Sequence, residues 1–331
     1  MDRNFEHFVI GGLQRSGTSL LRAILGSHSD ITVYQWDLEL WTKFSTIYYN
    51  KALNQPKQKR LVQDVLNHPK HTTAQIRLRE KEFSSLMKAY KTRNNNTFFV
   101  DFYREFLKLY LDKTDGSLIG LKTPENEFYT EAIFKEFPKT KFIHIIRNPL
   151  DVAVSLKKAK SRWWGGSMNY YSHVRKWKRS IEIAEKNKKQ YPNQYCIIKY
   201  EDLISNTEKV VQEICALLGV DYQESMLKME GHPGWKGHNS SAQQDTKIDK
   251  KFHSKSVDQY KDKLPQKVKQ LYFSYLASHL RKFGYSAKAE EVPFNEDLKY
   301  KINYLIDLMK TSIMRFLMRS WLYHPLKRIF N

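Results

Sequence analysis

The segment from Phe8 to Leu21, FVIGGLQRSGTSLL, most constrains what this chain can fold into. An apolar run is followed by a glycine-rich turn and by residues that can begin a helix. Gly12 to Ser19 fits the phosphate-loop pattern G-x-x-x-x-G-K-[ST] at every fixed position except one, where Thr18 replaces the lysine. Such a loop surrounds an anion with backbone N–H groups, and the helix N-terminus adds partial positive charge. The alternative is an ordinary turn.

The missing lysine narrows the class of ligand. In ATP- and GTP-binding loops this lysine reaches the terminal phosphates. We therefore expect the loop to hold a nucleotide 5′-phosphate rather than a triphosphate with magnesium, and Arg15 is available to supply the lost positive charge. A nucleotide kinase with a degenerate loop is a second enzyme hypothesis, against which Thr18 argues.

A second segment, Lys141 to Leu156, reads KFIHIIRNPLDVAVSL and has the pattern of a buried parallel strand, a turn and a helix. Arg147 ends the apolar run, and Ser155 lies in the helix that Asp151 opens. Ligands of open α/β sheets bind at the carboxyl ends of strands, so Arg147 and Ser155 can face one anion. The alternative is an arginine that caps the strand or pairs with Asp151.

Two further segments extend the pattern: Gly120 to Phe128 reads GLKTPENEF, and Ile197 to Leu203 reads IIKYEDL. Together the four segments resemble the PAPS-dependent sulfotransferases, where PAPS is 3′-phosphoadenosine 5′-phosphosulfate. Their motifs are most similar to those of the glycan and protein-tyrosine branches. The resemblance runs from about Phe5 to Tyr285. It implies an α/β fold of the P-loop-like type, with three layers in which helices flank a central parallel sheet.

The resemblance also implies roles for individual residues. Lys122 is expected to stabilise charge on the bridging oxygen of PAPS, and Arg147 with Ser155 to bind its 3′-phosphate. The catalytic candidates are Arg15, Asp37, Glu39 and Lys122. The candidates for cofactor contact are Gly12, Gln14, Arg15, Ser16, Gly17, Thr18, Ser19, Arg147, Ser155, Tyr200, Asn239, Ser240, Tyr260 and Lys261. No metal is expected, because no His, Cys, Asp and Glu residues cluster at metal-ligand spacing.

The base that accepts the acceptor's proton is a carboxylate in this interpretation. Glycan- and tyrosine-sulfating relatives have a glutamate shortly after a His-Pro-Asp-like turn, which here is His28-Ser29-Asp30. Spacing from His28 puts Asp37 at the position of the glycan branch and Trp36 at that of the tyrosine branch. Asp37 is therefore favoured and Glu39 comes second; the alternative is a solvated surface acid.

The net charge of +21 predicts anionic partners. Much of it lies in residues 57–93 and 157–189, which are either solvated helix faces or a groove for an acidic glycan. No zinc-finger, RNP or basic-zipper pattern supports nucleic acid as a partner. The two cysteines, Cys196 and Cys215, sit in apolar segments and suit a reducing compartment.

Periodicity predicts strands that alternate with helices, and hence a parallel sheet. The predicted strands are 5–10, 97–101, 117–121, 141–146 and 195–200. The predicted helices are 18–26, 102–111, 127–137, 151–159, 172–189 and 207–218, with a basic helical region up to about residue 92. Residues 31–36 are expected in a loop. Residues 231–250 are expected as a lid or as a polar loop, and the resemblance implies that this region closes over the nucleotide.

We divide the chain into a sulfotransferase domain, 1–286, and a basic amphipathic helical extension, 287–331. Apolar residues of the extension recur at helical spacing, and charged residues interrupt any membrane-spanning run. The extension is expected to dock on the domain, to form a homodimer contact or to lie on an anionic membrane surface. The first strand follows the N-terminus within a few residues, which predicts a cytoplasmic protein, peripheral to the inner face of a membrane if the extension binds one.

The sequence thus predicts in-line transfer of a sulfuryl group from PAPS to an acceptor hydroxyl. Basic helices and the loop Trp163-Trp164-Gly165-Gly166 favour a saccharide or glycolipid as the acceptor. A protein tyrosine or a small alcohol is the alternative. A third hypothesis, from another class, is a non-catalytic basic scaffold at membranes or on acidic polymers.

Overall fold

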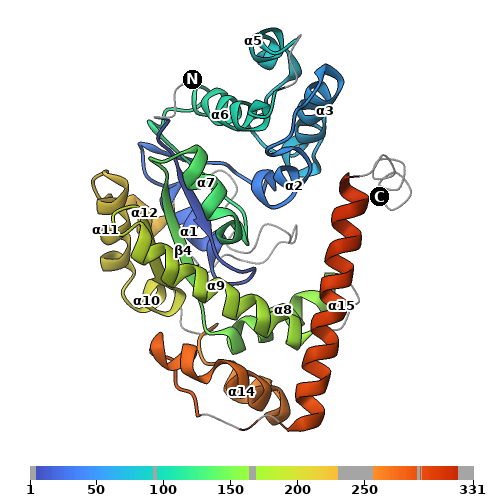
Figure 1. The fold of residues 1–331 in the computed structure, drawn as a ribbon. Helices are drawn as coiled ribbons and strands as arrows, with labels where there is room; N and C mark the ends of the chain where they lie inside the picture. The colour runs from blue at the N-terminus through green and yellow to red at the C-terminus, as the bar shows by residue number, and fades with distance from the viewer. Residues whose placement is uncertain are drawn as a thin grey trace.

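A computed structural model describes residues 5–91, 95–163, 169–229, 256–288, 291 and 293–319 of the chain. Five parallel strands form one sheet in the order β2-β3-β1-β4-β5 (Figure 1). The strands are β1 (Phe8–Gly11), β2 (Ile31–Val33), β3 (Leu118–Lys122), β4 (Lys141–Ile146) and β5 (Tyr195–Lys199). The first strand lies in the middle, so the loop that follows it meets the carboxyl ends of its neighbours β3 and β4.

Helices cover both faces of the sheet, which gives the three-layer P-loop-like fold that the sequence predicts. The N-terminal half contributes α1 (Thr18–Leu25), α2 (Ser45–Tyr48), α3 (Gln55–Leu66), α4 (Pro69–Thr72), α5 (Ser84–Ala89), α6 (Phe98–Leu111) and α7 (Thr130–Glu136). The C-terminal half contributes α8 (Pro149–Trp163), α9 (Tyr170–Gln190), α10 (Tyr200–Ser205), α11 (Thr207–Leu218), α12 (Ser225–Lys228), α13 (Tyr260–Lys263), α14 (Gln266–Lys282) and α15 (Phe294–Arg319). Short turns of other helix types are η1 (Leu40–Phe44), η2 (Glu80–Phe83) and η3 (Asn126–Tyr129).

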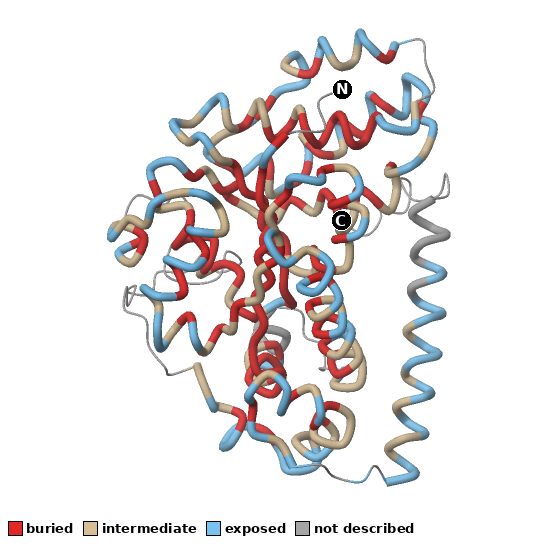
Figure 2. The backbone as a smooth tube through the Cα atoms, turned by 60° about the vertical axis from the view of Figure 1, so that its left-hand side comes forward, coloured by how far each residue is buried: buried red, intermediate tan, exposed pale blue. Residues whose placement is uncertain are grey.

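Alternate side chains of the central strand enter two separate cores. Phe8 and Ile10 pack with α1 and α11 on one face of the sheet. Val9 packs on the other face with the aromatic residues of α6. All three are fully buried, as Figure 2 shows for the middle of the sheet. A strand buried on both faces requires a nearly continuous apolar run, which explains why β1 and β4 were recognisable in the sequence.

One predicted strand is wrong. Residues 97–101 form no strand, because α6 already begins at Phe98. The buried positions Phe98, Phe102 and Phe106 recur every four residues, and their aromatic side chains mimic the composition of a strand over the first turn. The loop expected over residues 31–36 is also wrong in part, because Ile31–Val33 pairs with β3 as the edge strand β2.

The C-terminal region docks on the domain through α14 and α15. Tyr275 of α14 stacks on Tyr300 of α15 with ring centroids 4.1 Å apart. Arg175 of α9 donates to the carbonyl oxygens of Tyr300 and Asn303 at 3.4 and 3.3 Å, and it pairs with Asp307. The predicted docking of the extension is therefore seen for one side of α15. The division of the chain at residue 286 stays a prediction.

Candidate functional site

The loop between β1 and α1 has a backbone that restricts its sequence. Gly12 has φ +134°, and a Cβ there would lie 2.3 Å from the carbonyl oxygen of Ile145. Gly17 has φ +99°, and a Cβ there would lie 2.5 Å from the ring of Tyr200. Arg15 also has a left-handed φ of 71°, which is uncommon for a residue with a side chain. The two glycines are thus required by close backbone approach, as a phosphate-binding loop demands.

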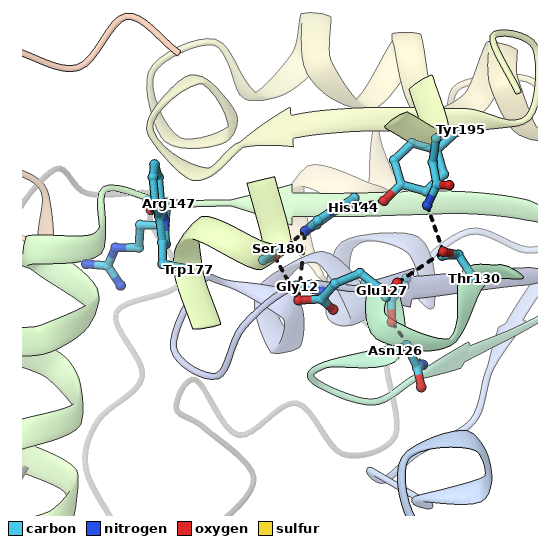
Figure 3. A network of polar contacts seen from close by, with 11 residues as sticks. Gly12, Asn126, Glu127, Thr130, His144, Arg147, Trp177, Ser180 and Tyr195 are labelled. Atoms are coloured by element: carbon cyan, nitrogen blue, oxygen red, sulfur yellow. Dashed lines mark hydrogen bonds and ion pairs between the residues drawn. The ribbon is translucent and has the colours of Figure 1, made fainter. Parts of the chain in front are cut away.

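A buried carboxylate holds the first turn of this loop in place (Figure 3). The N–H of Gly12 donates to Glu127 Oε2 at 2.8 Å, and Ser180 Oγ donates to Glu127 Oε1 at 2.9 Å. Ser180 also bonds His144 Nε2 at 3.0 Å, and His144 Nδ1 meets the hydroxyl of Tyr195 at 2.7 Å. Burial raises the pKa of Glu127 to about 7 and lowers that of His144 to about 3. The network therefore ties the loop to η3, β4, β5 and α9.

Two arginines converge beside the loop. Arg15 Nε donates to Ser155 Oγ at 2.8 Å, and Arg147 Nη1 donates to the carbonyl oxygen of Arg15 at 2.9 Å. The guanidinium of Arg147 lies over the ring of Tyr200, 4.3 Å from its centroid. Burial, and then the charge of Arg147, lower the pKa of Arg15. Two cations this close repel each other, so an anion between them relieves a cost that the fold otherwise bears.

One buried donor of this cluster lacks a partner among the described residues. Arg147 Nε is buried and makes no hydrogen bond there. An unpaired buried donor costs about 1–3 kcal/mol. Arg147, Arg15 and Ser155 therefore fit a phosphate group, and the glycine-bounded loop beside them fits a second one. These features suit a nucleotide that carries phosphates at two positions, as PAPS does.

A buried lysine lies on the other side of the loop. Lys122, the last residue of β3, forms an ion pair with Asp37 and donates to Ser19 Oγ of α1 at 3.2 Å. Arg22 of α1 lies 3.8 Å from the same Asp37 oxygen. The structure thus joins three predicted site residues, Ser19, Asp37 and Lys122, around one ammonium group.

The electrostatics of Lys122 and Asp37 favour the state in which both groups are ionised. Burial lowers the pKa of Lys122 to about 8, although the charge of Asp37 opposes this shift. Burial alone would raise the pKa of Asp37, but the charges of Lys122 and Arg22 outweigh it and lower the value. At neutral pH a buried ammonium therefore faces a buried carboxylate at the end of β3.

Glu39 has different partners. Its carboxylate lies 3.5 Å from His68 Nε2 and 3.8 Å from Lys43 Nζ, and its side chain is 36% exposed. Burial alone would raise the pKa of Glu39, but the hydrogen bond from His68 and nearby lysines lower it. The nearest partners of Glu39, His68 and Lys43, thus differ from Lys122 and Arg22, the nearest partners of Asp37.

The remaining residues predicted to contact the cofactor differ in burial and in their partners. Ser16 and Thr18 are buried in the loop and at the start of α1, whereas Gln14 is exposed. The hydroxyl of Tyr200 meets Ser256 Oγ at 2.7 Å.

Two candidates for cofactor contact, Tyr260 and Lys261, contact α8 or are exposed to solvent. The N–H of Tyr260 donates to Asp151 at 3.0 Å, and Lys261 pairs with Asp258 on the surface at 2.6 Å. Residues 231–250, with Asn239 and Ser240, and residues 164–166 lie outside the described part of the chain.

Sequence reasoning missed two residues. Arg22 is the one charged residue in the apolar helix α1 and is only 1% exposed, a signal that the sequence contained. Glu127 lies inside the motif GLKTPENEF. An acidic residue near the start of a helix is typical of a solvated first turn, so the sequence did not indicate that Glu127 is buried. Only its complete burial distinguishes it.

A basic hollow lies next to the segment that carries Asp37. It has a volume of about 510 Å³, and its lining includes His71, Arg77, Arg79 and Lys113. His71 Nδ1 bonds the hydroxyl of Tyr34 at 2.9 Å. The hollow is therefore connected through His71 to Tyr34, which follows β2 and lies three residues before Asp37.

Comparison with known proteins identifies the class. The family described as "Sulfotransferase family" matches residues 7–224. A protein-tyrosine sulfotransferase of Drosophila melanogaster is 23% identical over 232 residues, which are 69% of this chain and 41% of that protein. A putative protein-tyrosine sulfotransferase of Caenorhabditis briggsae is 25% identical over 229 residues, which are 68% of this chain and 69% of that protein. The chain thus spans less than half the length of the Drosophila protein.

A solved structure supports the same architecture. The sulfotransferase domain of the Synechococcus PCC 7002 olefin synthase superposes with a TM-score of 0.58 at 18% identity, covering 87% of this chain and 98% of that domain. At this identity the likeness concerns the fold. The family match extends over most of the chain, so this protein belongs to the sulfotransferase family. The predicted membership of the sulfotransferase family is thereby confirmed.

Proposed function

We propose that this chain transfers the sulfuryl group of PAPS to an acceptor hydroxyl at the carboxyl ends of β1, β3 and β4. The observation that carries the proposal is Lys122, a fully buried ammonium that contacts both the loop helix, at Ser19, and the candidate base, Asp37. When bound, PAPS supplies the sulfuryl group and the phosphate oxygen that leaves. The loop amides from Ser16 to Ser19 would hold the 5′-phosphate, and Arg147, Arg15 and Ser155 the 3′-phosphate.

Lys122 can serve either Asp37 or an anion on the loop. When its ammonium turns to a phosphate oxygen, it stabilises charge there, and Asp37 loses its nearest cation. The pKa of Asp37 then rises, because an opposite charge no longer stabilises the carboxylate as strongly. A proton from an acceptor hydroxyl can pass to Asp37 under these conditions. The shared lysine would thus couple donor binding to activation of the base.

Substitution of the two carboxylates tests this proposal. Asp37→Asn is nearly isosteric and should lower kcat at least about 100-fold, the usual contribution of a general base. Its affinity for PAP, the desulfated product, should change by no more than about threefold, because PAP contacts are made by other residues. Glu39→Gln, the matched control, should keep most of the activity. Full activity of Asp37→Asn would refute the assignment, and loss only in Glu39→Gln would move the base to Glu39.

We further propose a saccharide bearing acidic groups as the acceptor, presented free or on a lipid. The support is the hollow lined by Arg77, Arg79 and Lys113, whose lining residue Gln75 donates its N–H to Gln35, two residues before Asp37, at 2.8 Å. Arginine forks match carboxylate and sulfate oxygens, so an acidic sugar is retained there better than a neutral alcohol.

A tyrosine side chain is the second candidate, because two relatives carry the name protein-tyrosine sulfotransferase. Transfer of labelled sulfate from PAPS to acidic glycosaminoglycan oligosaccharides, neutral sugars and acidic tyrosyl peptides separates the two. Arg77→Gln should raise KM for the oligosaccharides several-fold, whereas Lys59→Gln, at an exposed position of α3, should not. Labelling of the peptides alone would replace the saccharide assignment.

A further inference from the structure

The C-terminal helix α15 carries an apolar stripe on the side that does not touch the domain. At 100° per residue, its members fall within about a third of the helix circumference. They are 46% to 82% exposed: Phe294, Leu298, Ile302, Leu305, Met309 and Ile313. At 1.5 Å per residue the stripe is about 28 Å long. Large contiguous apolar surface on a folded domain marks an interaction site.

The opposite side of α15 makes its polar contacts with the domain. Glu296 accepts a hydrogen bond from Tyr171, and Asp307 pairs with Arg175 of α9. Asp297 pairs with Lys301 and accepts from Tyr275 at 3.2 Å. The acidic residues of the helix are thus neutralised by the domain or by a neighbouring lysine. The helix is anchored by one side and presents the other outward (Figure 1).

Charge distinguishes between the possible partners of this stripe. From Leu308 to Asn331 the sequence contains five Lys or Arg residues and no Asp or Glu. A second copy of the chain carries the same net charge of +21, so two copies repel each other as they approach. An anionic surface is attracted to the same charges. In the described part of the chain, no helix is long and apolar enough to cross a membrane.

We propose that α15 is a membrane-surface anchor whose apolar stripe inserts into the interface of an anionic lipid bilayer. Apolar burial and attraction to acidic headgroups add together in this mode of binding. The helix lies in the plane of the surface, and the domain is held beside it through Arg175 and the stacked Tyr275 and Tyr300. The proposal does not depend on which acceptor the enzyme uses.

Flotation of the full chain with lipid vesicles tests the anchor at about 0.15 M salt. Phosphatidylcholine vesicles with added phosphatidylserine should bind the chain, and pure phosphatidylcholine vesicles should bind it far more weakly. Leu305→Glu with Met309→Glu removes two apolar anchors and should lower partitioning at least about tenfold. Both residues are exposed, so folding and PAP affinity should be unchanged.

A charge-matched control isolates the stripe from the basic domain. Ser205→Glu with Gln212→Glu changes the net charge equally on α10 and α11, across the molecule from α15 (Figure 1), and should leave binding nearly intact. Equal loss in both double variants would show that overall charge alone drives binding and would overturn the proposal. A dimer in solution that Leu305→Glu with Met309→Glu converts to a monomer, without vesicle binding, would assign the stripe to a second copy instead.

Discussion

Two cationic clusters flank the glycine loop, and they differ in whether an acid neutralises them. Arg15 and Arg147 come together with a serine, a tyrosine ring and backbone carbonyls. Lys122 comes together with Asp37, and Arg22 lies close to the same carboxylate. In the first cluster the cations repel each other, whereas in the second an internal anion already satisfies the cation.

This difference separates the residues that we expect to bind the nucleotide from those that we expect to act in the transfer reaction. An anion is attracted more strongly at the arginine cluster, because the partners of these guanidiniums in the described part of the chain are hydroxyl and carbonyl oxygens rather than a carboxylate. At Lys122 an anion must compete with Asp37, so its net gain is smaller and the freed carboxylate changes its basicity. We infer that the arginine cluster supplies most of the nucleotide affinity, and that the Lys122–Asp37 pair responds to what the nucleotide carries.

The largest effect on nucleotide affinity is expected at Arg147. Arg147→Ala removes a buried charged donor and should weaken PAP binding at least about 30-fold, as for loss of charge-assisted hydrogen bonds. Lys122→Met should weaken it much less, because its ammonium is already paired. Calorimetric titration with PAP measures both. Arg147→Lys keeps the charge but loses the planar fork, and an intermediate affinity would distinguish lost recognition from a damaged fold. Equal losses at Arg147 and Lys122 would remove the distinction between the clusters.

The sequence predicted one part of the arginine cluster, Arg147 with Ser155, better than the lysine pair. It placed Arg15 at the 5′-phosphate instead, whereas Arg15 Nε donates to Ser155 Oγ. Arg147 and Ser155 are eight residues apart in one strand-turn-helix unit, so local spacing was sufficient to bring them to one end of the sheet. Asp37 and Lys122 are far apart in sequence, and their contact depends on how the chain after β2 folds back. Spacing from His28 could select Asp37 as a candidate, but it could not reveal that a buried lysine pairs with it.

Local sequence patterns were similarly limited for the strands and helices around the site and for the residue that supports the loop. Buried strands such as β4 were predicted because both of their faces are apolar. Residues 97–101 were misassigned because four aromatic or branched residues in five also suit a helix that is buried on most sides. Glu127 was missed as a loop support because burial of a carboxylate is a tertiary property, and an acid in a polar motif gives no local sign of it.

The pH dependence of kcat/KM tests whether the charge of Lys122 is required for activity. The pKa of Lys122 is lowered to about 8, so the free enzyme loses this positive charge as pH rises through that value. We expect kcat/KM to fall about tenfold per pH unit above it, because one deprotonation abolishes the active form. The guanidiniums stay charged throughout and cannot cause this limb. Lys122→Arg, where activity is measurable, should abolish the limb; persistence of the limb would assign it to another group.

A smaller effect on affinity than at Arg147 is expected at Glu127, which supports the loop through the Gly12 N–H. Glu127→Gln keeps an acceptor for the Gly12 N–H and should weaken PAP binding only several-fold. Its stability should depend on pH more clearly. The pKa of Glu127 is raised from 4.5 to about 7, so the folded state binds the extra proton between these values. The wild-type chain thus loses up to about 3 kcal/mol from this site as pH rises through 7.

Glutamine carries no titrating proton. Between pH 5 and pH 8 the free energy of unfolding of Glu127→Gln should therefore fall less than that of the wild-type chain, and the pKa shift of this one group sets the difference. Denaturant unfolding at both pH values measures the difference. His144, Ser180 and Tyr195 surround the same carboxylate, and the pKa of His144 is lowered to about 3, so it stays neutral across this range. Parallel pH profiles of the two chains would show that Glu127 does not titrate there. The loop would then rest on a carboxylate that is ionised throughout, which adds negative charge behind an anion site and would make Glu127→Gln bind PAP more tightly than the wild-type chain.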